Sequence, residues 1–143
     1  MNKPNTGILS VPEGFEIIEG KGPYTDINGP FFGKIVSKDK VVRAFRVEER
    51  HLNSIKIVHG GMLMTFADSA LAAAVRHVSG RSSVTIKMNS EFLSPAREGD
   101  WVESDVEVIR STRSVAFVRG ELKVGKRVIF KADAIFHYVH ARR

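Results

Sequence analysis

The sequence contains no cysteine, which excludes disulfides, a thiolate nucleophile and cysteine-ligated metal sites. No continuous hydrophobic segment occurs near the N-terminus, so nothing indicates a secretory signal. The Gly-x-Ser-x-Gly, P-loop and Gly-x-Gly-x-x-Gly motifs are also missing, which leaves serine hydrolases, nucleotide hydrolases and dinucleotide-binding enzymes without support. We therefore expect no cofactor and no metal ion, and the lack of cysteine suits a cytoplasmic protein.

The composition is that of an ordinary globular protein. The chain has 143 residues, of which 43% are apolar and 27% charged, and we expect a single domain over residues 1–143. The net charge is +6, but no run of five like charges and no nucleic-acid-binding motif occurs, so we expect no nucleic-acid partner. Such diffuse positive charge would instead help to attract a polyanionic ligand.

Hydrophobic periodicity predicts a sheet and one long helix. The helix covers residues 60–78, and the predicted strands are residues 31–37, 41–47, 84–93, 101–109, 114–122 and 127–138. Residues 1–22 are expected to form an N-terminal extension with at most a short helix near residues 13–19. Short turns allow only antiparallel pairing, and a helix that is apolar almost all round must be enclosed. The sequence therefore predicts an α+β fold in which a curved antiparallel sheet of five to six strands wraps around one central helix.

One acid stands alone in the long helix. Asp68 is the only formal charge in residues 57–75, and burying it costs several kcal/mol unless it is hydrogen-bonded, paired or protonated. The helix is expected to start at His59-Gly60-Gly61, where free N–H groups and the helix dipole favour developing negative charge. A base on a helix and an anion cradle at its tip suit acyl transfer or hydrolysis. Asp68 and the glycine pair also indicate a helix buried in protein rather than in a membrane.

The spacing of these groups predicts a homodimer. Gly60 and Asp68 are eight residues apart, which is about 12 Å along a helix. A reacting atom must lie within about 3 Å of both the oxyanion donor and the base or its water. One helix cannot provide both groups, whereas a second, antiparallel copy brings Asp68 of one chain near Gly60 of the other. We expect two active sites across the dimer interface.

A longer motif supports this interpretation. His-x-Asn-x₅-His-Gly-Gly is followed by an Asp nine residues after the second His, at His51, Asn53, His59, Gly60, Gly61 and Asp68. With the element order, this motif resembles the hotdog-fold thioesterase superfamily, in the branch typified by the phenylacetic-acid-degradation thioesterase. The resemblance covers about residues 30–139 and departs at Thr112, where many relatives have glycine. It implies a cytoplasmic acyl-CoA thioesterase without cofactor, in dimers that pair into tetramers.

The resemblance also assigns roles to residues. The Gly60 N–H would stabilise the oxyanion, and Asp68 would act as general base or as nucleophile. Asn53 would hold the water or the substrate carbonyl, and Thr85 would orient the water. For His59 we favour fixing of the loop by hydrogen bonding over ionisation in turnover.

Structural alternatives stay open for these residues. Asp68 could be a hydrogen-bonded buried acid, Asn53 a turn residue and Thr85 an ordinary strand residue. Alternation places Thr85 on the face of its strand opposite Val84, Ile86 and Met88.

Several residues are candidates for substrate binding. Gly61 is counted among them, with close packing rather than catalysis as its expected role. The candidates for the phosphates and adenine of coenzyme A are Lys87, Arg97, Arg110 and Arg113. Each of these cations could equally be a solvated surface charge. Candidates for the acyl pocket are Met62, Phe66, Met88 and Phe92.

Other functions remain as alternatives. A dehydratase of the same fold would normally require an Asp/His pair on a different motif. A non-catalytic acyl-CoA-binding or regulatory domain is the rival from another functional class. The sequence leaves open the acyl group and the choice between coenzyme A and acyl carrier protein.

Overall fold

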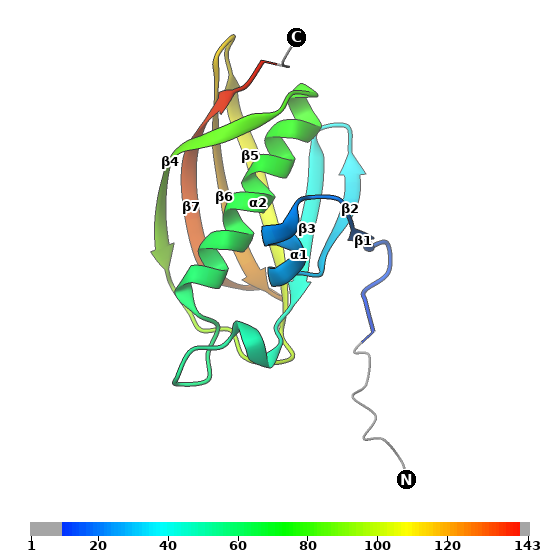
Figure 1. Ribbon diagram of the computed structural model, residues 1–143, viewed down its shortest axis with the longest axis vertical. Coiled ribbons are helices and arrows are strands. Elements are labelled where there is room, and N and C mark those ends of the chain that lie inside the picture. Colours follow the sequence, from blue (N-terminus) through cyan, green and yellow to red (C-terminus); the bar gives the residue numbers. More distant parts are fainter. Residues whose placement is uncertain (1–9, 141–143) are drawn as a thin grey trace.

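A curved sheet wraps around one long helix (Figure 1). The computed structural model describes residues 10–140. The elements in chain order are β1 (Glu16–Ile18), α1 (Pro23–Asn28), β2 (Phe31–Ser37), β3 (Lys40–Arg46), the 3-10 turn η1 (Glu49–His51), α2 (Gly60–Ser79), β4 (Ser83–Phe92), β5 (Trp101–Ser111), β6 (Val115–Val124) and β7 (Arg127–Tyr138). All strand pairs are antiparallel, in the order β1-β2-β3-β5-β6-β7-β4. The expected α+β fold, with an antiparallel sheet around a central helix, is confirmed.

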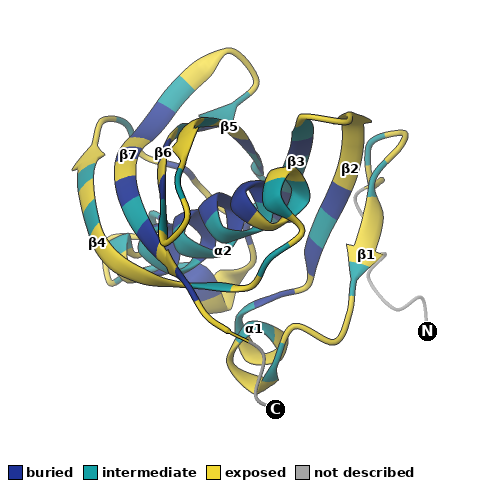
Figure 2. Cartoon of the chain, turned by 90° about the horizontal axis from the view of Figure 1, so that it is seen from above, coloured by how far each residue is buried: buried dark blue, intermediate teal, exposed yellow. Residues whose placement is uncertain are grey.

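The ends of α2 are fixed by local signals in the sequence. His59 caps the N-terminus, and Gly80 ends the helix in the left-handed conformation at φ 70°. The buried side chains of α2 are Met62, Leu63, Phe66, Ala67, Ala70, Leu71, Ala74 and Val75. Figure 2 shows this buried part of the helix enclosed by the sheet. Within residues 10–140, no helix is both long and apolar enough to cross a membrane.

The N-terminal region differs from the prediction. The helix expected near residues 13–19 is wrong, because this segment holds β1, in which Ile17 pairs with Phe32 of β2. Within residues 10–140 this extra strand makes seven strands rather than five or six, and its three residues are too few to show alternation. The helix α1 begins instead at Pro23, because the fixed φ of proline suits the first helical position. Residues 1–9 of the expected extension lie outside the described residues.

The edge strand β4 carries a bulge that changes which side chains face the helix. The register of β4 against β7 shifts between Thr85 and Lys87, and one extra residue reverses the alternation of faces. Thr85 consequently hydrogen-bonds to α2, while Val84 and Ile86 are 53% and 58% exposed. The single apolar face predicted for Val84, Ile86 and Met88 is therefore wrong, because only Met88 packs against the core.

Candidate active site

The tip of α2 leaves one backbone donor free. The Gly61 N–H donates to His59 Nδ1 at 2.8 Å. The N–H groups of Met62 and Leu63 donate to the His59 carbonyl at 2.9 and 3.2 Å. Within residues 10–140 the Gly60 N–H has no acceptor. Among the N–H groups of the first turn of α2, only that of Gly60 thus has no acceptor in the described part of the chain and is available to a ligand.

The two glycines at the tip are surrounded by different side chains. A Cβ on Gly61 would lie 2.9 Å from His59 Nδ1, so a larger residue would displace the capping ring. A Cβ on Gly60 would lie 3.2 Å from the ring of Phe92. Phe92 is 55% exposed and packs edge-to-face on Phe130 at 5.2 Å. Gly61 therefore allows the cap to form, and Phe92 borders the free Gly60 donor.

A buried histidine anchors the loop that leads to the tip. His51 Nδ1 accepts from the Glu48 N–H at 3.0 Å, and His51 Nε2 donates to the Asn28 carbonyl at 2.8 Å. Burial lowers the pKa of His51, and the bond to Asn28 opposes this effect in part. The His51 carbonyl in turn accepts from the His59 N–H at 2.8 Å. These bonds close the loop at its base and hold His59 beside Gly60.

Asn53 lies inside this closed loop. Its Oδ1 atom accepts from the N–H groups of Ile55 and Ile57 at 3.1 and 3.2 Å. Within residues 10–140, no acceptor bonds its Nδ2 atom. The loop thus uses the acceptor end of the amide and leaves its donor end available to a carbonyl oxygen or a water.

Asp68 and Thr85 form a pair between α2 and β4. Asp68 is half-buried, and the Thr85 hydroxyl donates to its Oδ1 atom. This bond supplies a polar partner for an acid in an apolar helix. It joins a carboxylate that could accept a proton to a hydroxyl that could hold a water. Sequence alternation could not predict it, because the bulge in β4 turns Thr85 toward the helix.

The other substrate-binding candidates are dispersed. Met62 and Phe66 belong to the buried core, whereas Phe92 borders the tip of α2. Lys87 on β4 and Arg110 on β5 lie in one row across the sheet, with β7 and β6 between them. Three strand spacings therefore separate them, which is about 14 Å. The remaining cations, Arg97 and Arg113, lie in the β4–β5 and β5–β6 connections. The structure does not bring these four cations together.

A different set of cations does converge. Lys21, Arg43 and Arg76 line one pocket of about 450 Å³ beside the C-terminal half of α2. They are not among the candidates that the sequence predicts. They come from the segment before α1, from β3 and from α2, and no motif or spacing connects them.

A model of the Thioesterase superfamily matches residues 55–130 of the chain. These residues include the tip of α2, Asp68 and Thr85. The match confirms the resemblance that the motif and the element order predict.

Individual proteins agree with this match. PA0474 of Pseudomonas aeruginosa, whose name marks it as a candidate esterase, is 34% identical over 91% of this chain and 98% of its own. Mouse acyl-coenzyme A thioesterase 13 is 26% identical over 65% of this chain and 73% of its own. The structure of the PaaI protein from the phenylacetic acid degradation operon of E. coli has the same fold, with a TM-score of 0.67 and 22% identity over 71% of this chain and 73% of its own.

Proposed function

The chain belongs to the thioesterase superfamily, and from that premise we propose that it hydrolyses acyl-CoA thioesters to a free acid and coenzyme A. The expected class, a thioester hydrolase, is the class of the family. The observation that carries the proposal is the free Gly60 N–H at the tip of α2, on the same helix as an Asp68 carboxylate held by Thr85.

The proposed reaction uses each of these groups once. The thioester oxygen accepts a hydrogen bond from the Gly60 N–H, and a water held by the Thr85 hydroxyl attacks the carbonyl carbon. Asp68 takes the proton of that water and returns it to the sulfur of coenzyme A as the carbon–sulfur bond breaks. The Asn53 Nδ2 donor supports the carbonyl or the water. Direct attack by Asp68, through an anhydride that water then hydrolyses, is the alternative use of the same carboxylate.

The site requires a second copy of the chain. The eight residues between Gly60 and Asp68 separate them by about 12 Å along α2. We propose that two copies pack with their α2 helices antiparallel, so that Gly60 of one copy meets Asp68 of the other. The exposed edge strand β4 supports this arrangement, because Val84 and Ile86 are more than half exposed on it. Pairing of dimers into tetramers is a further proposal that size measurement in solution tests.

Mixing two inactive variants tests the shared site. Gly60→Pro removes the N–H donor, and Asp68→Asn removes the base. Random one-to-one co-assembly leaves about a quarter of the sites with one intact Gly60 and one intact partner Asp68, so about a quarter of wild-type activity should return. The two variants assayed separately are the control. A mixture that stays as inactive as its components would contradict a site built across the interface.

Thiol release from a panel of acyl-CoAs tests the reaction itself. The panel contains phenylacetyl, hydroxybenzoyl and short to long straight-chain thioesters, with acyl carrier protein thioesters as a second carrier. We expect turnover by the wild type and a loss of at least about 100-fold for Asp68→Asn. If the wild type hydrolyses none of these thioesters, the proposal is wrong, and binding of acyl-CoA becomes the measurement for a non-catalytic domain.

A further inference from the structure

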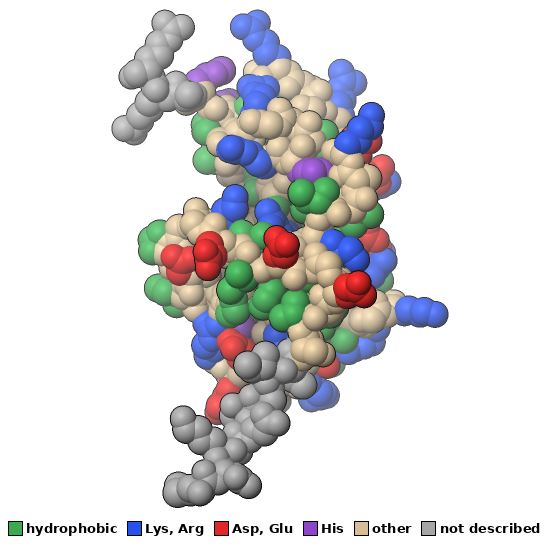
Figure 3. Space-filling view, turned by 90° about the vertical axis from the view of Figure 1, so that its right-hand side faces the viewer, with side chains coloured by type: hydrophobic (Ala, Val, Ile, Leu, Met, Phe, Trp, Pro, Cys, Tyr) green, Lys and Arg blue, Asp and Glu red, His purple; other side chains and the backbone are tan. Residues whose placement is uncertain are grey.

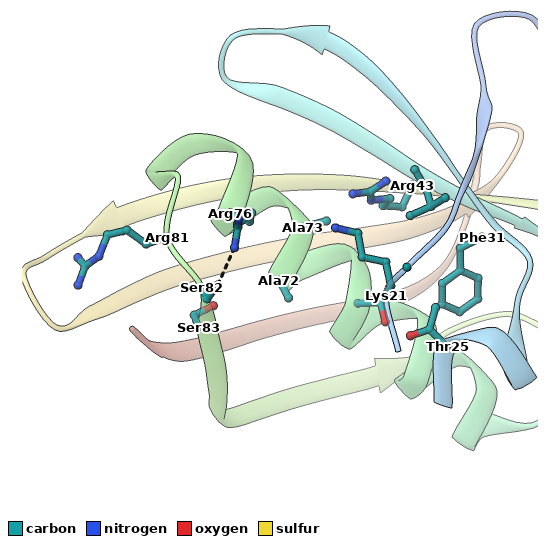
Figure 4. Close-up of a pocket in the computed structure, with 13 residues that line it drawn as sticks. Lys21, Thr25, Phe31, Arg43, Ala72, Ala73, Arg76, Arg81, Ser82 and Ser83 are labelled. Carbon is teal, nitrogen blue, oxygen red and sulfur yellow. Dashed lines mark hydrogen bonds between the residues drawn. The ribbon is translucent and has the colours of Figure 1, made fainter. Parts of the chain in front are cut away.

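One pocket gathers positive charge without an acid in its lining. It lies between the C-terminal half of α2, β3 and the start of β4, with a volume of about 450 Å³. Its charged lining residues are Lys21, Arg43, Arg76 and Arg81. Figure 4 shows Lys21, Arg43 and Arg76 around the same space, whereas Arg81 extends away from them. Arg81 is held elsewhere, because its guanidinium stacks on Tyr138 at 3.8 Å and donates to the Arg113 carbonyl at 3.1 Å.

The three converging cations have no anionic partner in the described part of the chain. None of Lys21, Arg43 and Arg76 forms an ion pair within residues 10–140. The same three cations also line an adjoining hollow along β1, whose lining includes Glu16 and Glu19, but no ion pair joins these acids to them in the described residues. Figure 3 shows Lys and Arg side chains spread over the face that includes β1 and β2, with Asp and Glu side chains across its middle. A ligand that enters the pocket therefore meets three cationic side chains that no ion pair engages in the described residues.

Arg43 is the most informative of the three. It is half-buried, and burial lowers its pKa below the usual arginine value, although the group stays charged. Its guanidinium lies against the backbone of Gly33, where a Cβ would collide with it. A charge that is partly removed from water costs free energy unless an opposite charge compensates it. The dipole of α2 explains a cation at Arg76 near its C-terminus but not at Arg43 or Lys21.

The pocket adjoins the proposed reaction site. It is also lined by Ser69, which follows Asp68, and by Ser83, two residues before Thr85. Arg76 lies eight residues beyond Asp68, or about 12 Å along α2. In the proposed antiparallel dimer the helices overlap over residues 60–68, so the C-terminal half of each α2 extends past the tip of its partner. The pocket is thus placed to receive the part of a substrate that is remote from the thioester.

We propose that Lys21, Arg43 and Arg76 bind the phosphate groups at the nucleotide end of the coenzyme A thioester. The inference rests on the proposed function, since it assigns a subsite of the same substrate. Arginine forks pair with phosphate oxygens through two parallel hydrogen bonds, and a lysine ammonium adds a point charge. Arg76 Nη1 already donates to the Ser82 hydroxyl at 2.6 Å, which orients its side chain at the pocket wall.

Substrates of decreasing length test this subsite. Kinetics are compared for one acyl-CoA, for the same acyl group on dephospho-coenzyme A, and for its acyl-pantetheine, which lacks the nucleotide. For Arg76→Gln we expect the KM for acyl-CoA to rise about tenfold, for Arg43→Gln/Arg76→Gln by more, and kcat to stay within about twofold. The KM for acyl-pantetheine should not change in either variant. The dephospho substrate lacks only the 3′-phosphate. A substitution that removes a contact to this phosphate should therefore leave the KM for the dephospho substrate unchanged, whereas one that removes a contact to the diphosphate should raise it.

The control removes two exposed cations outside the pocket, in Arg119→Gln/Lys126→Gln, and should leave the KM within about twofold. An equal rise in the control would assign the effect to general attraction. An equal rise for acyl-pantetheine would show that the pocket does not hold the nucleotide. Arg76→Gln alters an exposed side chain and serves if Arg43→Gln does not fold.

Calorimetric binding of coenzyme A provides a second measurement that needs no turnover. The affinity should fall in the pocket variants by the same factor as the KM rises, and unchanged affinity would overturn the proposal. If no thioester is hydrolysed, the proposed function fails, while this binding experiment still decides the role of the pocket.

Discussion

The two halves of α2 provide different kinds of partner for a negatively charged group. Residues 60–68 contain no basic side chain, and the available donor is the Gly60 N–H of the backbone. Beside residues 69–79, the available groups are side chains: Lys21, Arg43 and Arg76. The direction of the helix explains the contrast, because its N-terminus exposes N–H groups and its C-terminus exposes carbonyls. An anion near the C-terminal end must therefore be held by side-chain cations.

This contrast implies a division of labour. A backbone N–H is fixed in position, which suits an oxyanion that exists only in the transition state. Long cationic side chains suit a charge that the substrate carries throughout. Substitutions in the N-terminal half should therefore lower kcat, and substitutions at the basic pocket should raise KM.

Removing the Gly60 N–H gives the largest expected effect. Gly60 is the first residue of α2, where proline is favoured, and His59 has ψ 135°, which suits the residue before a proline. Gly60→Pro should thus remove the donor and preserve the helix. We expect kcat for thioester hydrolysis to fall by about 10²–10³ and KM to change little.

Gly60→Ala is the matched control, because it keeps the N–H. Its Cβ would lie 3.2 Å from the ring of Phe92, an exposed side chain that can move. Activity near that of the wild type is expected. An unchanged kcat in Gly60→Pro would contradict the role of the N-terminal half of α2, because the oxyanion would then be bound elsewhere.

The position of the tip should depend on His51. Because burial lowers the pKa of His51, the unfolded chain binds a proton that the folded chain does not. The free energy of unfolding should therefore be complete above the unfolded histidine pKa of about 6.5 and fall as the pH drops below it. His51→Gln should remove this decline and cost about 1–3 kcal/mol, because one of the bonds to Glu48 and Asn28 is lost.

Urea unfolding between pH 5 and 8 measures both effects. His137→Gln is the control, because His137 is exposed on β7 and should leave the pH dependence in place. A decline that persists unchanged in His51→Gln would assign the pH dependence to another group.

The N-terminal half of the site was accessible from the sequence. Asp68 is recognisable as a lone charge in an apolar run, and the caps at His59 and Gly80 are local signals. Helical periodicity, capping and motif spacing all depend on neighbours in the chain. They predict α2 over residues 60–78, against Gly60–Ser79 in the structure.

The C-terminal half was not accessible in this way. Lys21, Arg43 and Arg76 come together only when the β1–α1 connection, β3 and α2 are packed, and in the sequence each resembles an ordinary solvated charge. β1 has only three residues and no visible alternation. The bulge at Thr85 depends on the register against β7, which the sequence of β4 alone does not define.

Thr85 marks the boundary between the two halves, and its expected effect on kcat is smaller than that of Gly60. Its hydroxyl bonds Asp68, while Ser83, two residues earlier, lines the basic pocket. Thr85→Val removes the hydroxyl and keeps the shape of the side chain. A hydrogen bond to a charged group contributes about 1.5–3 kcal/mol, so we expect kcat to fall about tenfold or more with little change in KM.

Thr85→Ser distinguishes the hydroxyl from the packing of the side chain, because it keeps the hydroxyl and removes only the methyl group. This variant should retain most of the activity. Steady-state kinetics with one acyl-CoA and its acyl-pantetheine measure both parameters. If Thr85→Val instead raises the KM for acyl-CoA alone, Thr85 belongs to the nucleotide subsite. Asp68 would then react without the help of Thr85. If kcat falls equally for both substrates, the boundary lies between Ser83 and Thr85, so that two residues along β4 separate the reaction from the recognition of its substrate.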